Sequence, residues 1–136
     1  MSSTEGTLTY EVEAAFESAM PTRELTLTEA RDWLEELCRA EDLDTPRLEV
    51  VKLRPTLDAA AIPEEWCLLV TDVAPTQHTL LHELAHLSCA NRGHGREFRT
   101  QLVRYLRRWV SVGHAADLHA RFVAAGLGID PFSATR

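Results

Sequence analysis

The segment 79–86, with sequence TLLHELAH, constrains the fold most, because its H-E-x-x-H pattern has a chemical use only on a helix. Residues four apart on an α-helix lie on one face, and His82 and His86 would be roughly 6 Å apart along the axis. Two imidazole nitrogens at that spacing can both reach one ion at about 2.0–2.1 Å, the usual zinc–nitrogen distance. Glu83 is placed to take a proton from a water molecule on the metal.

The residues around the motif favour the helix that it needs. Leucine and alanine are good helix formers, and neither proline nor glycine occurs between His78 and Asn91. We expect Pro75 or Thr76 to open this helix and Arg92 to end it.

His94 is the predicted third metal ligand, since a catalytic zinc site typically has three protein ligands and an open position. It stands between Gly93 and Gly95, just past the motif helix, and glycine commonly follows a helix end. A histidine on such a turn can fold back toward the motif. The other candidates are farther along the chain or off this turn: Glu97, His114, Asp117 and His119.

The pair of segments HELAH (82–86) and HGREF (94–98) resembles the HExxH…HGxxF signature of SprT-like and WLM-type zinc metallopeptidases. Within that group the chain is similar to small bacterial and phage metallohydrolases. The specific match covers residues 81–98, and a looser match in element order runs over 28–127. The resemblance implies a Zn²⁺ ion held by His82, His86 and His94, with Glu83 as general base and a protein or peptide as substrate.

Two departures and two alternatives accompany this resemblance. The chain has neither a C-terminal cysteine-rich zinc ribbon nor a long basic DNA-binding segment, so a DNA-repair role is not implied. The first alternative is a regulatory zinc protein resembling the ImmA/IrrE group, in which Glu97 would replace His94. The second is a non-catalytic zinc-binding interaction module. The HGxxF pattern favours a zinc metallopeptidase, and hydrolysis of a non-peptide amide stays open.

Charge is distributed unevenly along the chain. Residues 1–91 hold 6 Lys and Arg against 18 Asp and Glu, a net charge of −12, whereas residues 92–136 hold 8 against 3, a net charge of +5. The arginine-rich segment 92–108 allows nucleic acid as a partner. We favour a solvated helix face that pairs with acidic residues, because the aromatic platform typical of single-strand binders is missing.

The remaining features indicate a cytoplasmic protein without a membrane partner. No apolar run reaches the roughly 20 residues that span a membrane, and the N-terminus does not have the pattern of a signal peptide. The three cysteines are far apart, which argues against a disulfide framework. The sequence indicates no oligomeric state.

The predicted fold is a single α+β domain over 1–136, a minimal zincin-like arrangement of a small twisted sheet, an active-site helix and a C-terminal helical pair. We expect helices over 8–20, 28–40, 76–92, 98–112 and 115–125, strands over 47–54 and 66–71, a loop over 57–63, and loose ends at 1–7 and 130–136. Thr28 is the predicted N-cap of the second helix. Either strand is a candidate edge for binding an extended peptide.

Two further roles in the site, the donor to the oxyanion and the acceptor from the ligating histidines, have several candidate residues each. The oxyanion of the reaction needs a donor, for which Tyr105, Arg96, His78 and His114 are candidates. Ligating histidines usually donate their second N–H to an oxygen, for which Asp72, Glu97 and Asp117 are candidates.

Overall fold

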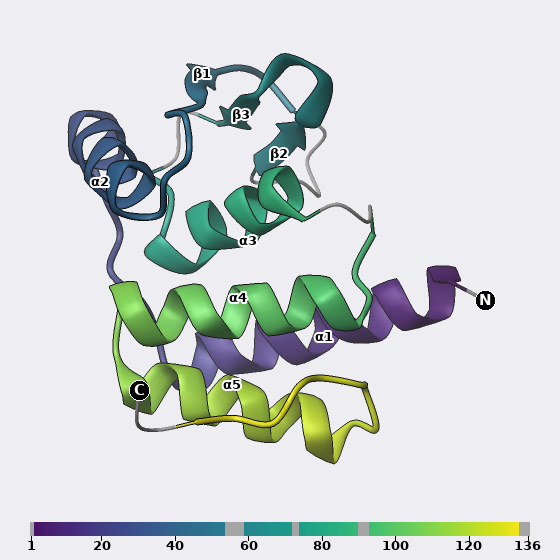
Figure 1. Ribbon diagram of the computed structural model, residues 1–136. Helices are drawn as coiled ribbons and strands as arrows, with labels where there is room; N and C mark the ends of the chain where they lie inside the picture. The colour runs from purple at the N-terminus through teal and green to yellow at the C-terminus, as the bar shows by residue number, and fades with distance from the viewer. Residues whose placement is uncertain (1, 54–58, 72–73, 90–92, 134–136) are drawn as a thin grey trace. The chain divides into compact units, whose positions relative to one another are not determined.

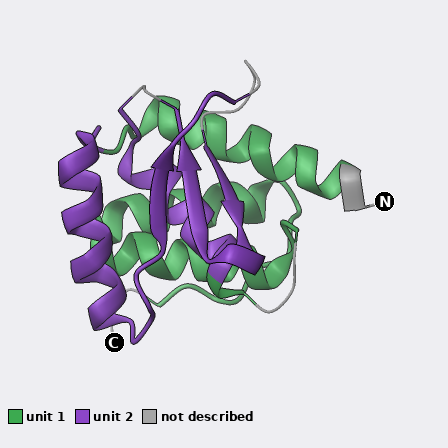
Figure 2. Cartoon of the chain, turned by 90° about the horizontal axis from the view of Figure 1, so that it is seen from above, with its two compact units in different colours: residues 1–22, 88–136 green, residues 23–87 purple. Residues whose placement is uncertain are grey.

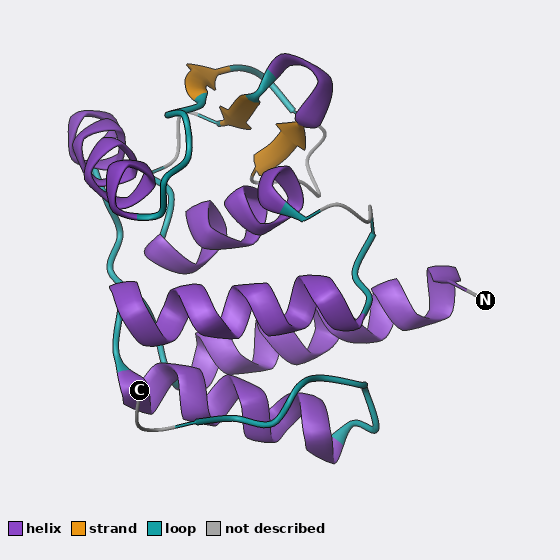
Figure 3. Ribbon diagram, viewed as in Figure 1, coloured by secondary structure: helices purple, strands orange, loops and turns teal. Residues whose placement is uncertain are grey.

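The computed structural model describes residues 2–53, 59–71, 74–89 and 93–133, with side chains from residue 4 onward. Within them the protein is α+β, with five α-helices and a three-stranded mixed sheet. The chain divides into two compact units (Figure 2): unit 1 is residues 1–22 and 88–136, and unit 2 is residues 23–87. Figures 1 and 3 show the elements: α1 (Ser2–Ala19), α2 (Leu27–Ala40), β1 (Arg47–Val50), β2 (Ala59–Ile62), the 3-10 turn η1 (Pro63–Glu65), β3 (Cys67–Val70), α3 (Gln77–Ser88), α4 (Arg96–Trp109) and α5 (Val112–Ala124).

Strand β3 is the centre of the sheet in unit 2. It pairs in parallel with β1 and antiparallel with β2, so the strand order is β1-β3-β2. Cys67, Leu68 and Val70 are buried, as expected for an apolar run flanked by a strand on each side. The strand predicted over 66–71 is therefore confirmed in place, but its role as a sheet edge is wrong.

Strand β2 occupies residues for which the sequence predicted a loop. The run Ala59–Ile62 is mostly alanine, which has low strand propensity, and pairing with β3 overrides that weak local signal. Residues 54–58, including the end of the predicted 47–54 strand, lie outside the described part of the chain. The sheet edges are thus β1 and β2, and the carbonyl of Leu48 on β1 already accepts a 3.3 Å hydrogen bond from Arg31 of α2.

The N-cap of helix α2 lies two residues earlier than predicted, at Thr26 rather than at Thr28. The Thr26 hydroxyl accepts from the Glu29 amide at 3.1 Å, and the Glu29 carboxylate accepts from the Thr26 amide at 2.8 Å. This reciprocal capping box follows the pattern T-x-x-E, which Thr28 lacks because Arg31 stands three residues later. The bond from the Thr26 amide lowers the pKa of Glu29.

The apolar stripe of α2 forms part of the core of unit 2, as its helical spacing predicted. The buried members are Ala30, Leu34, Leu37 and Cys38. Trp33 of the same helix is half-buried.

Helix α3 carries the H-E-x-x-H segment, and in Figure 1 the sheet of unit 2 lies above it. The Thr76 hydroxyl accepts from the Thr79 amide at 3.1 Å, which confirms Thr76 as the residue that opens the helix. The helix ends at Ser88, four residues before the predicted end at Arg92. Residues 90–92 lie outside the described part of the chain.

In unit 1, helices α1, α4 and α5 lie side by side (Figure 1). The prediction of a loose segment over 1–7 is wrong, since α1 begins at Ser2. Thr9, Glu13 and Phe16 are buried at helical spacing. The first turns of α1 are polar, and a residue far away in the sequence stabilises them. Arg99 of α4 donates to the Glu5 carboxylate at 2.7 Å and forms an ion pair with it.

Capping residues separate α4 from α5 and end α5. The Ser111 hydroxyl accepts from the His114 amide at 2.9 Å, so Ser111 caps α5 and Gly113 lies in its first turn. Gly126, with a φ of 77°, follows the end of α5, close to the predicted end at residue 125. Asp130 is not loose: its backbone amide donates to Thr100 at 3.1 Å, while residues 134–136 lie outside the described chain.

Candidate metal centre

Most residues of helix α3 are buried, so packing determines which of its side chains remain accessible. The buried residues are His78, Leu80, Leu81, His82, Leu84, Ala85 and Leu87. A half-buried stripe remains at Thr79, Glu83 and His86, which are spaced four and three residues apart. Glu83 and His86 therefore share the accessible side of the helix, with His82 next to them on its buried side.

His82 and His86 form a close imidazole pair on α3. Their ring centroids are 4.9 Å apart with planes at 69°. His82 is 5% exposed, whereas His86 is half-buried. The sequence predicted this juxtaposition from the four-residue spacing, and the structure brings the two rings together as that spacing requires.

A third histidine, His78, continues the row one turn earlier. Its ring centroid lies 6.5 Å from that of His82, and it is buried. Among the described residues, His78, His82 and His86 each belong to groups of histidine and glutamate side chains that could hold a metal ion. His78 is not among the metal ligands predicted from the sequence, although its spacing of four from His82 is a signal in the sequence.

The imidazole and carboxylate groups of α3 suit a metal ion of intermediate softness, such as zinc. Imidazole nitrogens with a nearby carboxylate suit zinc and similar transition metals, whereas calcium and magnesium prefer oxygen ligands. His82, Glu83 and His86 stand as predicted on one helix of unit 2.

His94 belongs to unit 1, on the turn that the flanking glycines predicted. Gly93 has a φ of 102°, a conformation that favours glycine, and Gly95 is the N-cap of α4. The His94 ring lies against two aromatic side chains, with centroids 4.5 Å from Tyr10 and 5.0 Å from Phe98. Phe98 is buried and is thus a packing residue of the helix after the turn.

Most of the other candidate residues have partners elsewhere. Arg96 pairs with Asp130 at 2.8 Å, Tyr105 donates to the Ser88 hydroxyl at 2.8 Å, and His114 lies 2.6 Å from that of Ser111. His78, the remaining oxyanion donor candidate, lies on the same helix as the motif.

The structure also shows the surroundings of most of the alternative third ligands and of the carboxylates proposed to accept from the ligating histidines. Asp117 forms a 2.6 Å ion pair with Arg121 on α5, and His119 contacts the carbonyl of Asp130 at 2.9 Å. Glu97 is exposed in the first turn of α4. Asp72 lies outside the described residues.

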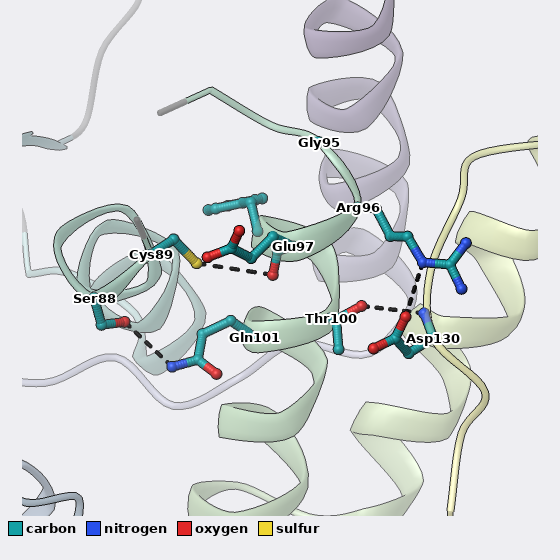
Figure 4. Close-up of a pocket in the computed structure, with 9 residues that line it drawn as sticks. Ser88, Cys89, Gly95, Arg96, Glu97, Thr100, Gln101 and Asp130 are labelled. Atoms are coloured by element: carbon teal, nitrogen blue, oxygen red, sulfur yellow. Dashed lines mark hydrogen bonds and ion pairs between the residues drawn. The ribbon is translucent and has the colours of Figure 1, made fainter. Parts of the chain in front are cut away.

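A pocket of about 540 Å³ opens in unit 1 beside the turn that carries His94 (Figure 4). Its lining comes from the end of α3, the start of α4 and the C-terminal segment: Ser88, Cys89, Gly95, Arg96, Glu97, Phe98, Thr100, Gln101 and Asp130. Gln101 donates to Ser88 at 3.3 Å, and the Cys89 thiol donates to the Glu97 carbonyl at 3.7 Å. The pocket is therefore walled by hydroxyl, amide and charged groups as well as by an aromatic ring.

The arginine-rich segment is not a uniform cationic surface. Arg99 is buried, and Arg96 pairs with Asp130. The guanidinium groups of Arg104 and Arg108 lie over the adjacent Tyr105 and Trp109 rings, at 5.0 and 5.2 Å from their centroids. Arg92 lies outside the described residues.

Comparison of the chain with protein-family models, with curated proteins and with solved structures finds no match. The resemblance of residues 81–98 to SprT-like and WLM-type peptidases therefore stays a prediction that rests on the motif residues themselves. No helix among the described residues combines the length and the apolar character needed to cross a membrane.

Proposed function

We propose that the protein is a zinc-dependent metallopeptidase in which His82, His86 and His94 hold the metal and Glu83 is the general base. The observation that carries this proposal is the imidazole pair of α3, with ring centroids 4.9 Å apart beside a half-buried glutamate. The turn at His94 supplies the third ligand that a catalytic zinc site typically needs.

The chemistry divides between the metal and Glu83. When bound, zinc supplies a Lewis acid that lowers the pKa of a coordinated water molecule to about 7 and polarises the scissile carbonyl. Glu83 accepts a proton from the attacking water and passes it to the nitrogen of the leaving amine. Its position on the accessible stripe of α3 gives the carboxylate access to a substrate, while His82 on the buried side stays fixed by packing.

An extended peptide is the substrate that these features favour. A peptide can add to a sheet edge through main-chain hydrogen bonds, and β2 is the better edge because Arg31 already occupies a carbonyl of β1. We propose that the pocket beside Gly95 receives a substrate side chain, since all of its lining residues except Asp130 follow His86 or His94 closely in the chain.

Zinc content of the purified protein tests the metal centre. Elemental analysis of the wild type is expected to give about one zinc per chain, and His94→Ala is expected to lose it or bind it far more weakly. The matched control is His119→Ala, a histidine of unit 1 that contacts the carbonyl of Asp130. Full zinc in His94→Ala would move the third ligand to Glu97, as in the regulatory alternative, and no zinc in any variant would refute the enzyme.

Glu83→Gln separates an enzyme from a non-catalytic zinc module. The variant should keep its zinc, because Glu83 is not a ligand, but should lose roughly 10²–10⁴-fold of its hydrolytic rate through loss of the general base. Release of fluorescence from a labelled unfolded protein measures that rate, with Glu97→Gln as the control. If wild type and Glu83→Gln cleave equally slowly while both hold zinc, the non-catalytic alternative is favoured.

A further inference from the structure

Arg99 of α4 is a buried charge in unit 1, with 1% of its side chain exposed. A buried guanidinium is stable only when its N–H groups are hydrogen-bonded and its charge is balanced. Its nitrogens reach four acceptors: the Gly128 carbonyl at 2.8 Å, the Thr9 hydroxyl at 3.2 Å, the Glu5 carboxylate at 2.7 Å and the backbone carbonyl of His94. The guanidinium therefore connects the His94 turn to α1 and to the C-terminal segment.

The His94 carbonyl is held from a second direction as well. Thr9 of α1 lies with its hydroxyl 3.4 Å from that oxygen. This matters because the turn has little rigidity of its own, with a glycine on each side of His94. The ring contacts with Tyr10 and Phe98 restrain the His94 side chain, whereas these two bonds hold its backbone.

We propose that Arg99 is a positioning residue for the metal ligand His94, an inference that rests on the proposed function. Arg99 fixes the backbone of His94 and so limits where the imidazole can lie. A guanidinium suits this role because it presents five donors in a rigid fork and stays charged. Glu5 balances that charge, which makes the first turns of α1 part of the support of the metal centre.

Arg99→Lys tests the proposal, because lysine keeps the charge but cannot span the same acceptors. Competition with a chromophoric chelator measures the zinc dissociation constant, which should rise roughly 10–100-fold, as is typical when an outer support of a ligand is lost. The matched control is Arg121→Lys, since Arg121 is also an arginine of unit 1 and pairs with Asp117 on α5. Arg121→Lys should bind zinc as the wild type does.

The absorption spectrum of the cobalt-substituted protein distinguishes positioning from general stability. At saturating cobalt, Arg99→Lys should shift its visible bands toward those of His94→Ala, because the ligand geometry changes. Arg121→Lys should give the wild-type spectrum even if it unfolds more easily. A wild-type zinc affinity and cobalt spectrum in folded Arg99→Lys overturn the proposal.

A second variant decides the question if Arg99→Lys does not fold. Glu5→Ala removes the counter-charge at a half-exposed position, and it should weaken zinc binding in the same direction by a smaller factor. Unchanged zinc affinity in folded Glu5→Ala would then overturn the proposal. Failure of the proposed function is distinguishable, because His94→Ala would itself retain full zinc while Arg99→Lys had no effect.

Discussion

Cys89, three residues beyond His86, shows how the surroundings of one side chain determine its chemistry. Burial raises the pKa of its thiol to about 11, and the nearby Glu97 carboxylate adds to the effect. The thiol donates to the Glu97 carbonyl, which favours the protonated form. Partial burial and this hydrogen bond favour a structural role for Cys89.

The reactivity of Cys89 follows from that pKa. With a pKa of about 11 in place of 9.0, its thiolate fraction at pH 8 is about 100-fold lower, and alkylation by iodoacetamide should slow by about that factor. Mass spectrometry of the labelled peptide gives the rate, and glutathione is the reference thiol. The rate should rise about tenfold per pH unit until about pH 11. Labelling as fast as glutathione at pH 8 would contradict the prediction.

The same pKa shift gives a stability trend with a definite sign. A thiol whose pKa is higher in the folded than in the unfolded state stabilises the fold fully below pH 9. That contribution is lost as the pH rises through about 11, because the unfolded thiol releases its proton first. Cys38, whose pKa burial also raises to about 11, acts in the same direction.

Among the elements, α2 has the most complete local signal, since the T-x-x-E pattern encodes both of its capping bonds. Thr28 satisfied the general preference for threonine at an N-cap, and that preference alone misplaced the helix start by two residues. A reciprocal pair of bonds outweighs a single favourable residue type, because it satisfies two amides that the helix leaves without partners.

Removing the N-cap of α2 tests this assignment. Thr26→Ala should lower the free energy of unfolding by about 1 kcal/mol, the usual cost of losing such a cap. Urea denaturation followed by circular dichroism measures the change. Thr28→Ala, in the first turn of the same helix, is the control and should change the free energy by less than about 0.5 kcal/mol. Equal losses in the two variants would contradict the capping box.

The pH dependence of this cap has the opposite sign to that of the thiols. The pKa of Glu29 is lowered in the folded state by the Thr26 amide, so its contribution is present at neutral pH. This contribution of Glu29 to stability is lost as the pH falls below 4.5, the ordinary pKa of a glutamate, and then through the lower pKa of the folded state.

For the whole molecule, metal binding and folding should be coupled. An ion that binds only the native state raises the free energy of unfolding by about 2.7 kcal/mol when its free concentration is 100 times the dissociation constant. Zinc should therefore raise the thermal unfolding midpoint by several degrees, and a chelator should reverse the shift. Differential scanning calorimetry measures it.

The control for this coupling is His82→Ala, which removes a ligand from α3. Zinc should leave its unfolding midpoint unchanged. If zinc raised the midpoints of wild type and His82→Ala by the same amount, the ion would be binding elsewhere.

Local patterns in the sequence were enough to predict the α+β class, the helix that carries His82 and His86, and the glycine turn around His94. These features depend on hydrogen bonds and side-chain spacing within a few residues, which a short window of sequence records. His78 was missed as part of the histidine row, although the same spacing rule would have included it.

Contacts between residues distant in the chain determined the features that local patterns did not predict. Strand β2 exists because it pairs with β3, and α1 reaches back to Ser2 with Glu5 bound to a guanidinium 94 residues away. Arg99 looked like one member of an exposed basic segment, yet it is buried among acceptors from three separate parts of unit 1. Strand pairing and the burial of a charge depend on partners that are distant in the chain, so no local pattern could have revealed them.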